Sequence, residues 1–327
     1  MILLLGASGY IGQAFADELR RRGEPFIPLS RRAIDYTRFE ILFDYLRKIS
    51  PSFLINAAGY TGRPNIDSCE LERAESLQAN SVFPQIVAKA CYMTNTPWGH
   101  VSSGCIYSGI KRYGNGSWWI ERDLNKAETR QLFFEEPERF RPFTELDEPN
   151  FSFRHTPCSF YSGTKVLAEE TLREFANNYI WRPGIVFDQV DASRNFLSKI
   201  QRYPKVHDSV NPLSHRGDFV RACLDLWERS SAFGIYNVIN PGVITTRQVA
   251  ETIERVLSPD CRFEFWQDDE EFYRCAAKAP RPASVISGAK LLATGVRMRS
   301  VEDALEDTLE RWRSTTQPDG QVALAHW

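Results

Sequence analysis

The first twelve residues contain the pattern that most restricts the fold. An apolar run at 2–5 leads directly into Gly6-Ala-Ser-Gly9-Tyr-Ile-Gly12, and a helix is expected from about 10 to 22. In such a strand–turn–helix unit, Gly6 permits the tight turn, Gly9 lets the backbone approach a pyrophosphate, and Gly12 lets the helix pack on the strand. The N–H groups at the helix start then face the anion. This context favours a dinucleotide site over a purely structural glycine turn, with candidate contacts at Gly6, Ser8, Gly9, Tyr10, Ile11 and Gly12.

The alternation of strand and helix continues along the chain. Further strands are expected at 25–29, 53–56, up to about 101, 179–187 and 234–239, with helices at about 37–48, 77–92 and 161–177. Strands that alternate with helices are joined by parallel crossovers. The sequence therefore predicts an α/β fold, with a doubly wound parallel Rossmann sheet and a smaller, discontinuous C-terminal substrate domain.

The residues after the second expected strand bear on which dinucleotide binds. Ser30-Arg31-Arg32 stands where an acid would hold the 2′-hydroxyl of NAD, and arginine instead accommodates the 2′-phosphate of NADP. The alternative is a solvated basic loop. We expect NADP(H) rather than NAD(H), with Asp35 a further candidate on the adenine side.

Two regions interrupt the alternation and suggest domain boundaries. Residues 109–157 form a long aromatic and acidic insertion, which we expect to be a lid over the substrate or a subunit contact. After 241, amphipathic helices are separated by Pro-rich connectors. We assign 1–187 and 217–240, with the insertion, to an NADP-binding Rossmann domain, and 188–216 and 241–327 to the substrate domain.

Charge and cysteine usage exclude several classes of protein. Lys and Arg number 40 and Asp and Glu 42, a net charge of −2 that indicates neither a nucleic-acid nor a membrane partner. The seven cysteines form no C-x-x-C pair, and no histidine stands at zinc-finger spacing, so we expect a reduced cytoplasm and no metal site. No run of 18 apolar residues exists, and the apolar opening lacks the basic segment of a signal peptide.

A tyrosine and a lysine four residues apart open the helix expected after the insertion. The spacing in Tyr161-Ser-Gly-Thr-Lys165 puts both side chains on one helix face. A nearby ammonium favours tyrosinate, so we expect the pKa of Tyr161 to fall toward neutrality and the phenol to exchange a proton with a carbonyl or alcohol. Tyr107 and Lys111 share the spacing but lie in a glycine-rich turn, where no helix aligns them. A strand-end hydroxyl, Ser103, could share the substrate oxygen with Tyr161.

Together these segments resemble the extended short-chain dehydrogenase/reductases, in the order found in that family. The resemblance rests on the glycine turn, Asn56-Ala-Ala-Gly59, the Ser103 strand end, Tyr161 with Lys165, and Arg281-Pro-Ala-Ser284. Asn56 to Asn65, Ser103-Gly-Cys-Ile-Tyr107, Pro149-Asn-Phe151, Ser159-Phe-Tyr-Ser162 and Arg194 to Ile200 are similar to the nucleotide-rhamnose synthase/epimerase-reductase group, which includes dTDP-4-dehydrorhamnose reductase-like proteins. That group converts a nucleotide-4-keto-6-deoxyglucose to nucleotide-L-rhamnose.

The resemblance implies roles for individual residues. Ser103, Tyr161 and Lys165 would serve hydride transfer, and Cys105 and Lys199 the epimerisation of the ring, although a buried thiol and a solvated helix charge are the alternatives for the last two. Ala57, Ala58 and Gly59 would contact the cofactor together with Tyr161 and Lys165. Contacts to the nucleotide sugar would come from Thr61, Arg63, Asn65, Asn195 and Arg281, each of which could instead be a surface group or a cap.

The resulting hypothesis is an NADPH-dependent nucleotide-sugar 3,5-epimerase/4-reductase, possible as a homodimer. Related 4,6-dehydratases carry an Asp-Glu pair after the strand-end hydroxyl, where this chain has Gly104-Cys105, so dehydration is disfavoured. A plain 4-reductase fed by a separate epimerase stays open. A non-catalytic NADP-binding regulatory subunit is also open, but it would have no need for Ser103, Tyr161 and Lys165.

Overall fold

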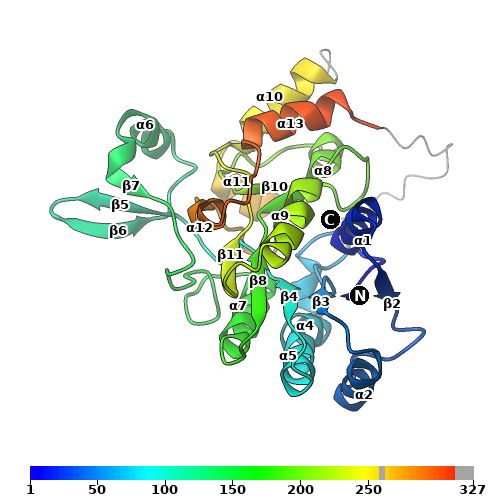
Figure 1. Ribbon diagram of the computed structural model, residues 1–327. Helices are drawn as coiled ribbons and strands as arrows, with labels where there is room; N and C mark the ends of the chain where they lie inside the picture. Colours follow the sequence, from blue (N-terminus) through cyan, green and yellow to red (C-terminus); the bar gives the residue numbers. More distant parts are fainter. Residues whose placement is uncertain (258–261, 314–327) are drawn as a thin grey trace.

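The computed structural model describes residues 1–257 and 262–313, and its centre is a six-stranded parallel sheet (Figure 1). The strand order is β11-β8-β4-β3-β1-β2. The strands are β1 (Ile2–Leu5), β2 (Phe26–Leu29), β3 (Phe53–Asn56), β4 (Trp98–Val101), β8 (Asn178–Arg182) and β11 (Gly234–Asn237). The order runs outward from β1 in both directions, so the predicted doubly wound sheet is confirmed.

Helices cover both faces of this sheet. One face carries α1 (Tyr10–Arg22) and α9 (Arg216–Glu228), and the other carries α2 (Phe39–Ile49), α5 (Phe83–Met93) and α7 (Phe160–Leu172). The sheet is packed tightly enough to require glycine at one central position. A Cβ on Gly99 would lie 1.9 Å from Cη2 of Trp181, which is fully buried. Burial on both faces explains why these strands are nearly continuous apolar runs.

The structure differs from the predicted elements in three places. The helix expected over 77–92 is divided into α4 (Arg73–Leu77), a π-helical turn η1 (Gln78–Val82) and α5. The helix expected to reach 177 ends at Leu172. The strand expected over 179–187 is divided into β8 and β9 (Ile185–Phe187), because Pro183 cannot donate to the ladder and Gly184 lies against Pro212. A Cβ on Gly184 would lie 2.2 Å from the Pro212 carbonyl oxygen.

A second group of elements packs beyond the carboxyl ends of the central strands. Strand β9 pairs in parallel with β10 (Leu213–His215). Around this pair lie α8 (Phe196–Arg202), α10 (Thr246–Val256) and α13 (Val301–Glu310), while α12 (Ala289–Ala293) packs on β11. Helix α11 (Asp269–Cys275) forms ion pairs with Lys205 and His207. Side chains from β9, β10, α8, α10 and α13 share a hydrophobic core of their own. The exact division into two domains stays a prediction.

The insertion folds into an antiparallel sheet with a helix. Strands β5 (Ile110–Gly114), β6 (Ser117–Glu121) and β7 (Phe140–Arg141) are ordered β6-β5-β7, and α6 (Ala127–Glu135) connects β6 to β7 through the short helix η2 (Pro137–Arg139). In Figure 1 this unit extends to one side, away from α1 and α2. Its base pairs with the chain after Arg281: the Gly109 N–H bonds to the Ala283 carbonyl at 2.6 Å, and the Phe143 N–H bonds to the Val285 carbonyl at 3.0 Å.

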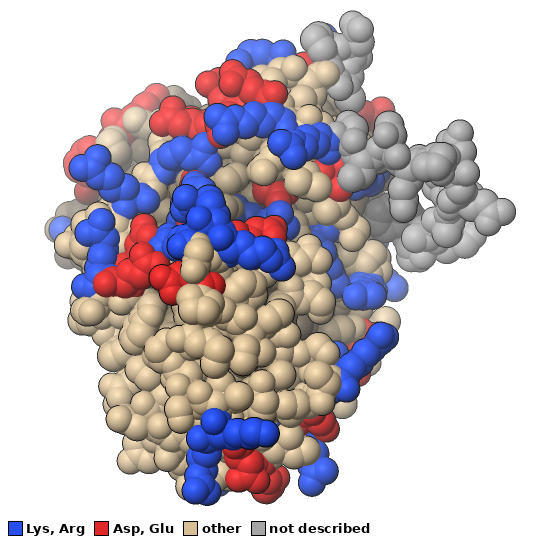
Figure 2. Space-filling view, turned by 45° about the vertical axis from the view of Figure 1, so that its right-hand side comes forward, with Lys and Arg blue, Asp and Glu red and all other residues tan. Residues whose placement is uncertain are grey.

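None of the helices in 1–257 and 262–313 is long and apolar enough to cross a membrane. The same residues contain no cluster of His, Cys, Asp or Glu suited to a metal ion. On the face drawn in Figure 2, basic and acidic side chains lie next to one another in the upper half, so charge of one sign does not cover that face.

Candidate active site

The glycine turn has the close contacts that its sequence predicts. Gly6 has a φ of +75°, and a Cβ there would lie 2.5 Å from the Ala58 nitrogen. A Cβ on Gly12 would lie 2.0 Å from the Gly6 carbonyl oxygen, so the helix can approach the strand only with glycine at this position. Gly9 is the N-cap of α1, and no described side chain caps this helix start. The first N–H groups of α1 are therefore available to an anion.

The loop after β2 contains two exposed arginines and one acid, Asp35, that is hydrogen-bonded to Thr37. Arg31 and Arg32 are exposed in the loop that follows β2. The Asp35 carboxylate accepts hydrogen bonds from the hydroxyl and N–H of Thr37, and the hydroxyl bond is the main cause that lowers the pKa of Asp35. Asp35 thus has a structural partner in Thr37, and its contact on the adenine side of the cofactor stays a prediction. The preference of Arg31 and Arg32 for NADP stays a prediction.

The segment after β3 passes between the glycine turn and the tyrosine–lysine helix. Asn56 is fully buried, and its Oδ1 accepts the Ala58 N–H at 3.1 Å. A Cβ on Gly59 would lie 3.5 Å from Nζ of Lys165. Since Ala58 also lies against Gly6, the predicted cofactor contacts at 6–12, 57–59 and 165 are brought to one edge of the sheet.

Ser103, Tyr161 and Lys165 meet at the carboxyl end of β4. Tyr161 and Lys165 lie on α7, whose N-cap Ser159 accepts the Ser162 N–H. Nζ of Lys165 donates to the Val101 carbonyl at 3.2 Å and lies 5.9 Å from the centre of the Tyr161 ring. The Ser103 hydroxyl lies near the Tyr161 phenol and lowers its pKa, although burial raises that pKa more strongly. A substrate oxygen between these two hydroxyls would also lie near the lysine.

The protonation of Tyr161 differs from the sequence prediction. Burial raises the pKa of Tyr161, although the nearby Ser103 hydroxyl opposes this effect. Burial also lowers the pKa of Lys165 to about 8, against the opposing charge of Glu169. The expected lowering of the phenol pKa was wrong for this structure, because the same loss of water disfavours both charged forms. Tyr161 therefore holds its proton, as a hydrogen-bond donor to a carbonyl must.

Cys105 and Lys199 both experience the charge of Arg281. The Cys105 N–H donates to Oγ of Ser103 at 3.1 Å, and Oγ of Ser162 donates to the Cys105 carbonyl at 2.6 Å. Burial raises the pKa of the Cys105 thiol, opposed by Ser103 and the charge of Arg281. Burial lowers the pKa of Lys199 to about 8, with Arg194 and Arg281 acting in the same direction. Cys105 is therefore a protonated thiol, and Lys199 loses its proton more readily than an exposed lysine.

Three arginines lie around the loop at 60–67. Nη1 of Arg194 donates to Oγ1 of Thr61 at 2.8 Å and to the Gly62 carbonyl at 2.7 Å. Burial lowers the pKa of Arg194, and the charge of Arg63 acts in the same direction. Arg281 is held by Asp67, with 2.8 Å between Nη2 and Oδ1. Together with Lys199, Arg63, Arg194 and Arg281 form a positive cluster around the ends of the loop at 60–67.

Asn195 caps a helix, and Asn65 closes a turn in the loop before α3 (Ser68–Leu71). Oδ1 of Asn65 accepts the Asp67 N–H at 2.8 Å. Asn195 is fully buried at the N-cap of α8, where its Oδ1 accepts the Leu197 N–H. Its amide donates to the Asp188 carbonyl and carboxylate. The Asn195 side chain therefore has structural partners already, and its contact with the substrate stays a prediction.

Asp188, which accepts a hydrogen bond from the Asn195 cap, also connects it to the glycine turn through Arg216 and Tyr10. Its Oδ2 lies 2.6 Å from Nε of Arg216, an ion pair that lacks hydrogen-bond geometry. The Arg216 guanidinium lies 4.4 Å from the centre of the Tyr10 ring, and its Nη1 donates to the Tyr10 carbonyl. Tyr10, predicted as a cofactor contact, is thus fastened to the start of α9.

Sequence reasoning missed two residues that the fold brings to the site. Arg194 lies within a segment that carried the family resemblance, and its position directly before the α8 cap was the available signal. Asn80 lies in η1, where its side chain exchanges two 2.8 Å hydrogen bonds with the Tyr60 backbone beside Gly59. No local pattern identifies Asn80, because its importance comes from a contact between distant segments.

The segment after β4 has little room for the acidic pair of the dehydratases, and it keeps Tyr107 and Lys111 out of the site. A Cβ on Gly104 would lie 2.9 Å from Cδ1 of Ile286 and 3.0 Å from the Pro183 carbonyl oxygen, so the backbone leaves little room for an acidic side chain there. Tyr107 is buried away from the site and donates to the Asp147 carbonyl, and Lys111 forms an ion pair with the Asp147 carboxylate. The exclusion of the Tyr107–Lys111 pair agrees with these contacts.

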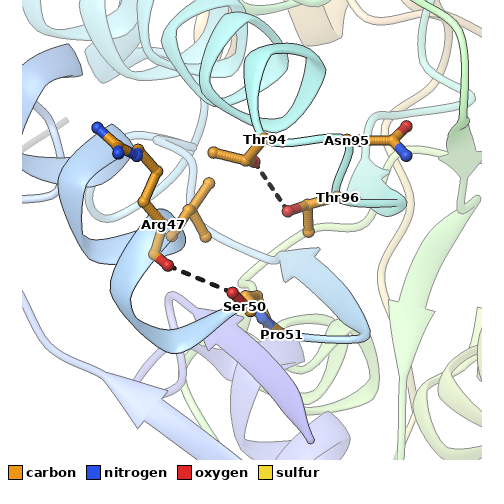
Figure 3. A pocket seen from close by; sticks show the side chains of 7 residues that line it. Arg47, Ser50, Pro51, Thr94, Asn95 and Thr96 are labelled. Carbon is orange, nitrogen blue, oxygen red and sulfur yellow. Dashed lines mark hydrogen bonds between the residues drawn. The ribbon is translucent and has the colours of Figure 1, made fainter.

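A surface depression of about 390 Å³ lies at the opposite end of the sheet (Figure 3). It is lined by polar residues that include Arg47, Ser50, Thr94 and Thr96, at the carboxyl ends of α2 and α5. The Thr94 and Thr96 hydroxyls are 2.8 Å apart. These elements precede β3 and β4, so the depression is at the amino edge of the strands, away from Ser103.

Comparison with known proteins places this geometry in context. The family model described as the RmlD substrate binding domain matches residues 1–314. A trifunctional UDP-glucose 4,6-dehydratase/UDP-4-keto-6-deoxy-D-glucose 3,5-epimerase/UDP-4-keto-L-rhamnose-reductase of Arabidopsis thaliana is 29% identical over 93% of this chain, which spans only 41% of that relative. A bifunctional dTDP-4-dehydrorhamnose 3,5-epimerase/dTDP-4-dehydrorhamnose reductase of the same plant is 27% identical, covering 93% of this chain and 90% of the relative.

Solved structures agree on the fold. The L780 UDP-rhamnose synthase from Acanthamoeba polyphaga mimivirus matches with a TM-score of 0.78 at 20% identity, covering 95% of this chain and 98% of that one. A dTDP-4-dehydrorhamnose reductase from Bacillus anthracis, solved in complex with NADP, matches with a TM-score of 0.71 at 20% identity, covering 95% and 97%. The bifunctional plant relative and the Bacillus anthracis neighbour are both named as reductases, in agreement with the predicted oxidoreductase class.

Proposed function

Because the chain belongs to the RmlD substrate binding domain family, we propose that it is an NADPH-dependent 3,5-epimerase/4-reductase of a nucleoside-diphosphate-4-keto-6-deoxyhexose. The observation that carries this proposal is the meeting of Ser103, Tyr161, Lys165 and Cys105 at one strand end. The first three suit reduction of a ketone. The fourth adds a second proton carrier, which a simple reduction does not need.

The residues present fit a dinucleotide phosphate. The uncapped start of α1 and the absent side chains at Gly6 and Gly9 would hold the pyrophosphate, and exposed Arg31 and Arg32 would pair with a 2′-phosphate. When bound, NADPH supplies the hydride for C4 of the sugar. Lys165, beside Gly59, would bind the nicotinamide ribose and stabilise negative charge near Tyr161.

Reduction requires a proton for the developing alkoxide at O4. Tyr161 keeps its proton because burial raises its pKa, and the nearby Ser103 hydroxyl would let the two groups hold O4 between them. The phenol then donates its proton as charge develops on O4. The neighbouring Lys165 ammonium compensates the phenolate that results, in a site from which water is largely excluded.

Epimerisation requires a base on one face of the ring and an acid on the other. The 4-keto group acidifies the protons on C3 and C5. Lys199, with its pKa lowered to about 8, would accept a proton as a neutral amine, and Cys105, held as a thiol, would return one. The positive cluster of Arg63, Arg194 and Arg281 would bind the diphosphate, for which the guanidinium fork is well suited.

The proposal is tested by separating its two halves in one experiment. Protein is incubated in D2O with NADPH and UDP-, dTDP- or GDP-4-keto-6-deoxyglucose, and NADPH oxidation and deuterium at C3 and C5 are followed together. Tyr161→Phe should slow NADPH oxidation by roughly 10²–10⁴-fold and leave deuterium exchange in place. Cys105→Ala should retain NADPH oxidation and lose full epimerisation.

Matched replacements of exposed residues serve as controls. Tyr92→Phe and Cys275→Ala remove the same groups from the surface and should change neither readout. NADPH oxidation without deuterium at C3 or C5 in the unaltered protein would establish a plain 4-reductase. NADPH binding without turnover of any of the three substrates would refute the enzymatic proposal and leave a regulatory subunit.

A further inference from the structure

The outer strand of the insertion has an edge that the described residues leave open. Strand β6 pairs with β5 on one side, and β7 pairs with the other side of β5. In Figure 1, β6 is the strand of this sheet farthest from α6. Within 1–257 and 262–313, no backbone hydrogen bond joins β6 to anything except β5. An open edge of this kind is a template for another strand.

The turn between β5 and β6 determines which groups point outward. Asn115 and Gly116, with φ of +48° and +77°, form a two-residue connection, and Gly114 is opposite Ser117. Such a turn is closed by a hydrogen-bonded pair, and hydrogen-bonded and open pairs then alternate along the hairpin. The N–H and C=O groups of Trp118 and Ile120 therefore point away from β5, toward the open edge.

The side chains of β6 are unusually apolar for an exposed edge. Trp118, Trp119 and Ile120 are 40%, 39% and 40% exposed. The single charge in the strand, Glu121, is neutralised by Arg112 at 3.0 Å. No proline or lysine occurs in 117–121. Monomeric proteins protect such an edge with charge, proline or a covering segment. Strand β6 has no proline and no unpaired charge, and no described segment covers its edge by backbone hydrogen bonds.

We propose that β6 pairs with β6 of a second copy of this chain, antiparallel and about a twofold axis through Trp119. In this register Trp118 lies opposite the partner's Ile120, Ser117 opposite the partner's Glu121, and the two Trp119 side chains face each other. The outward groups of Trp118 and Ile120 then form four backbone hydrogen bonds across the axis. The two three-stranded sheets become one continuous six-stranded sheet.

A second copy suits this edge because the strand is complementary to itself. Antiparallel pairing about Trp119 places an aromatic side chain opposite a β-branched one on each side and places no like charges in opposition. The central Trp119 pair falls at an open pair of the ladder, where side chains approach most closely. Closed twofold symmetry also satisfies both edges at once and leaves none for a third copy.

The area of the edge sets the expected strength. A fully exposed aromatic side chain offers roughly 150–250 Å², so the three exposed side chains and the adjacent backbone would bury roughly 300–400 Å² per copy. A stable complex buries about 800 Å² per partner. The dimer should therefore be weak and reversible, with dissociation at concentrations of tens of micromolar or higher.

Sedimentation velocity on the whole chain at about 1–500 μM tests the proposal. The unaltered protein should shift from monomer to dimer over this range. Trp119→Lys, which opposes two ammonium groups on the axis, should weaken dimerisation at least about tenfold, and so should Trp119→Glu. An equimolar mixture of the two variants should recover the dimer, because residue 119 meets its own copy and the charges become opposite.

A control and three outcomes make the test decisive. Phe134→Lys alters an exposed aromatic side chain of α6, away from the edge, and should leave dimerisation unchanged. Unchanged near-ultraviolet circular dichroism verifies that the variants fold. The proposal is overturned by a protein that stays monomeric at 500 μM, by a Trp119→Lys variant that dimerises as before, or by a mixture that does not recover the dimer.

Discussion

Replacing Lys165 by methionine is expected to stabilise the fold while abolishing reduction. Lys165 is 4% exposed, and burial lowers its pKa from 10.5 to about 8. The protein therefore carries an unfavourable buried charge at neutral pH. Methionine fills a similar volume without charge, and Glu169 keeps its partner because it forms a bidentate ion pair with Arg182.

The expected gain follows from the lowered pKa. The difference between 10.5 and about 8 corresponds to about 3 kcal/mol against the charged form. Losing the hydrogen bond from Nζ to the Val101 carbonyl costs about 1 kcal/mol. Lys165→Met should thus raise the free energy of unfolding by about 2 kcal/mol at pH 7.

The pH dependence fixes the sign of this effect. Between pH 8 and 10.5 the unfolded chain binds a proton that folded Lys165 has lost, so wild-type stability gains from this group as pH rises. The advantage of Lys165→Met should therefore shrink and be close to zero by pH 10. Subtracting the two proteins at each pH removes the contributions of cysteines and tyrosines that titrate in the same range.

Urea unfolding without cofactor, at pH 7 and pH 10, measures this difference. Lys48→Met, a replacement of an exposed lysine, is the matched control and should show no pH-dependent difference. A Lys165→Met variant that is less stable than wild type at pH 7 would refute the reasoning. A stability difference that stays constant from pH 7 to pH 10 would do the same.

Three further predictions concern the cofactor, the buried ion pair and the base. Arg31→Ala with Arg32→Ala should weaken NADPH binding by about 1.5–3 kcal/mol per lost contact and leave NADH binding unchanged. If fluorescence titration shows that both cofactors lose affinity equally, the two arginines do not select NADP. Glu169→Leu or Arg182→Met alone should cost about 3–5 kcal/mol in urea unfolding, while the double replacement should recover most of it; equal costs for all three would contradict this. Deuterium exchange into the sugar should rise as pH passes about 8, and a rise that persists in Lys199→Met would reassign the base.

The central sheet was predictable because its signals are local. Strands β1 and β3 match the predicted 2–5 and 53–56, since each is a short apolar run that ends in a turn or polar segment. The glycine turn was predictable for the same reason: the contacts of Gly6 and Gly12 are determined within a few residues or by the adjacent strand. The break at Pro183 had a local signal that the apolar run on either side obscured.

The electrostatics of the site could not be predicted in this way. The pKa of Tyr161 depends on how completely the fold removes water from it, and the spacing to Lys165 carries no information about burial. Arg194 and Arg281 meet because the loop at 60–67 bonds to both, a contact among three distant segments. Sequence patterns identified the types of residue at the site, but their charge states and partners come from tertiary packing.

The pairing between the base of the insertion and the chain after Arg281 has a consequence for folding during synthesis. The β5–β6 hairpin forms from neighbouring residues, but the bonds from Gly109 and Phe143 need Ala283 and Val285, which leave the ribosome much later. The dinucleotide half of the site can thus assemble while the protein is still being made. The basic cluster is completed only when Arg281 has emerged. A nascent chain that stops before 279 lacks Arg281. It should bind the cofactor but should bind the sugar diphosphate more weakly than the whole chain does.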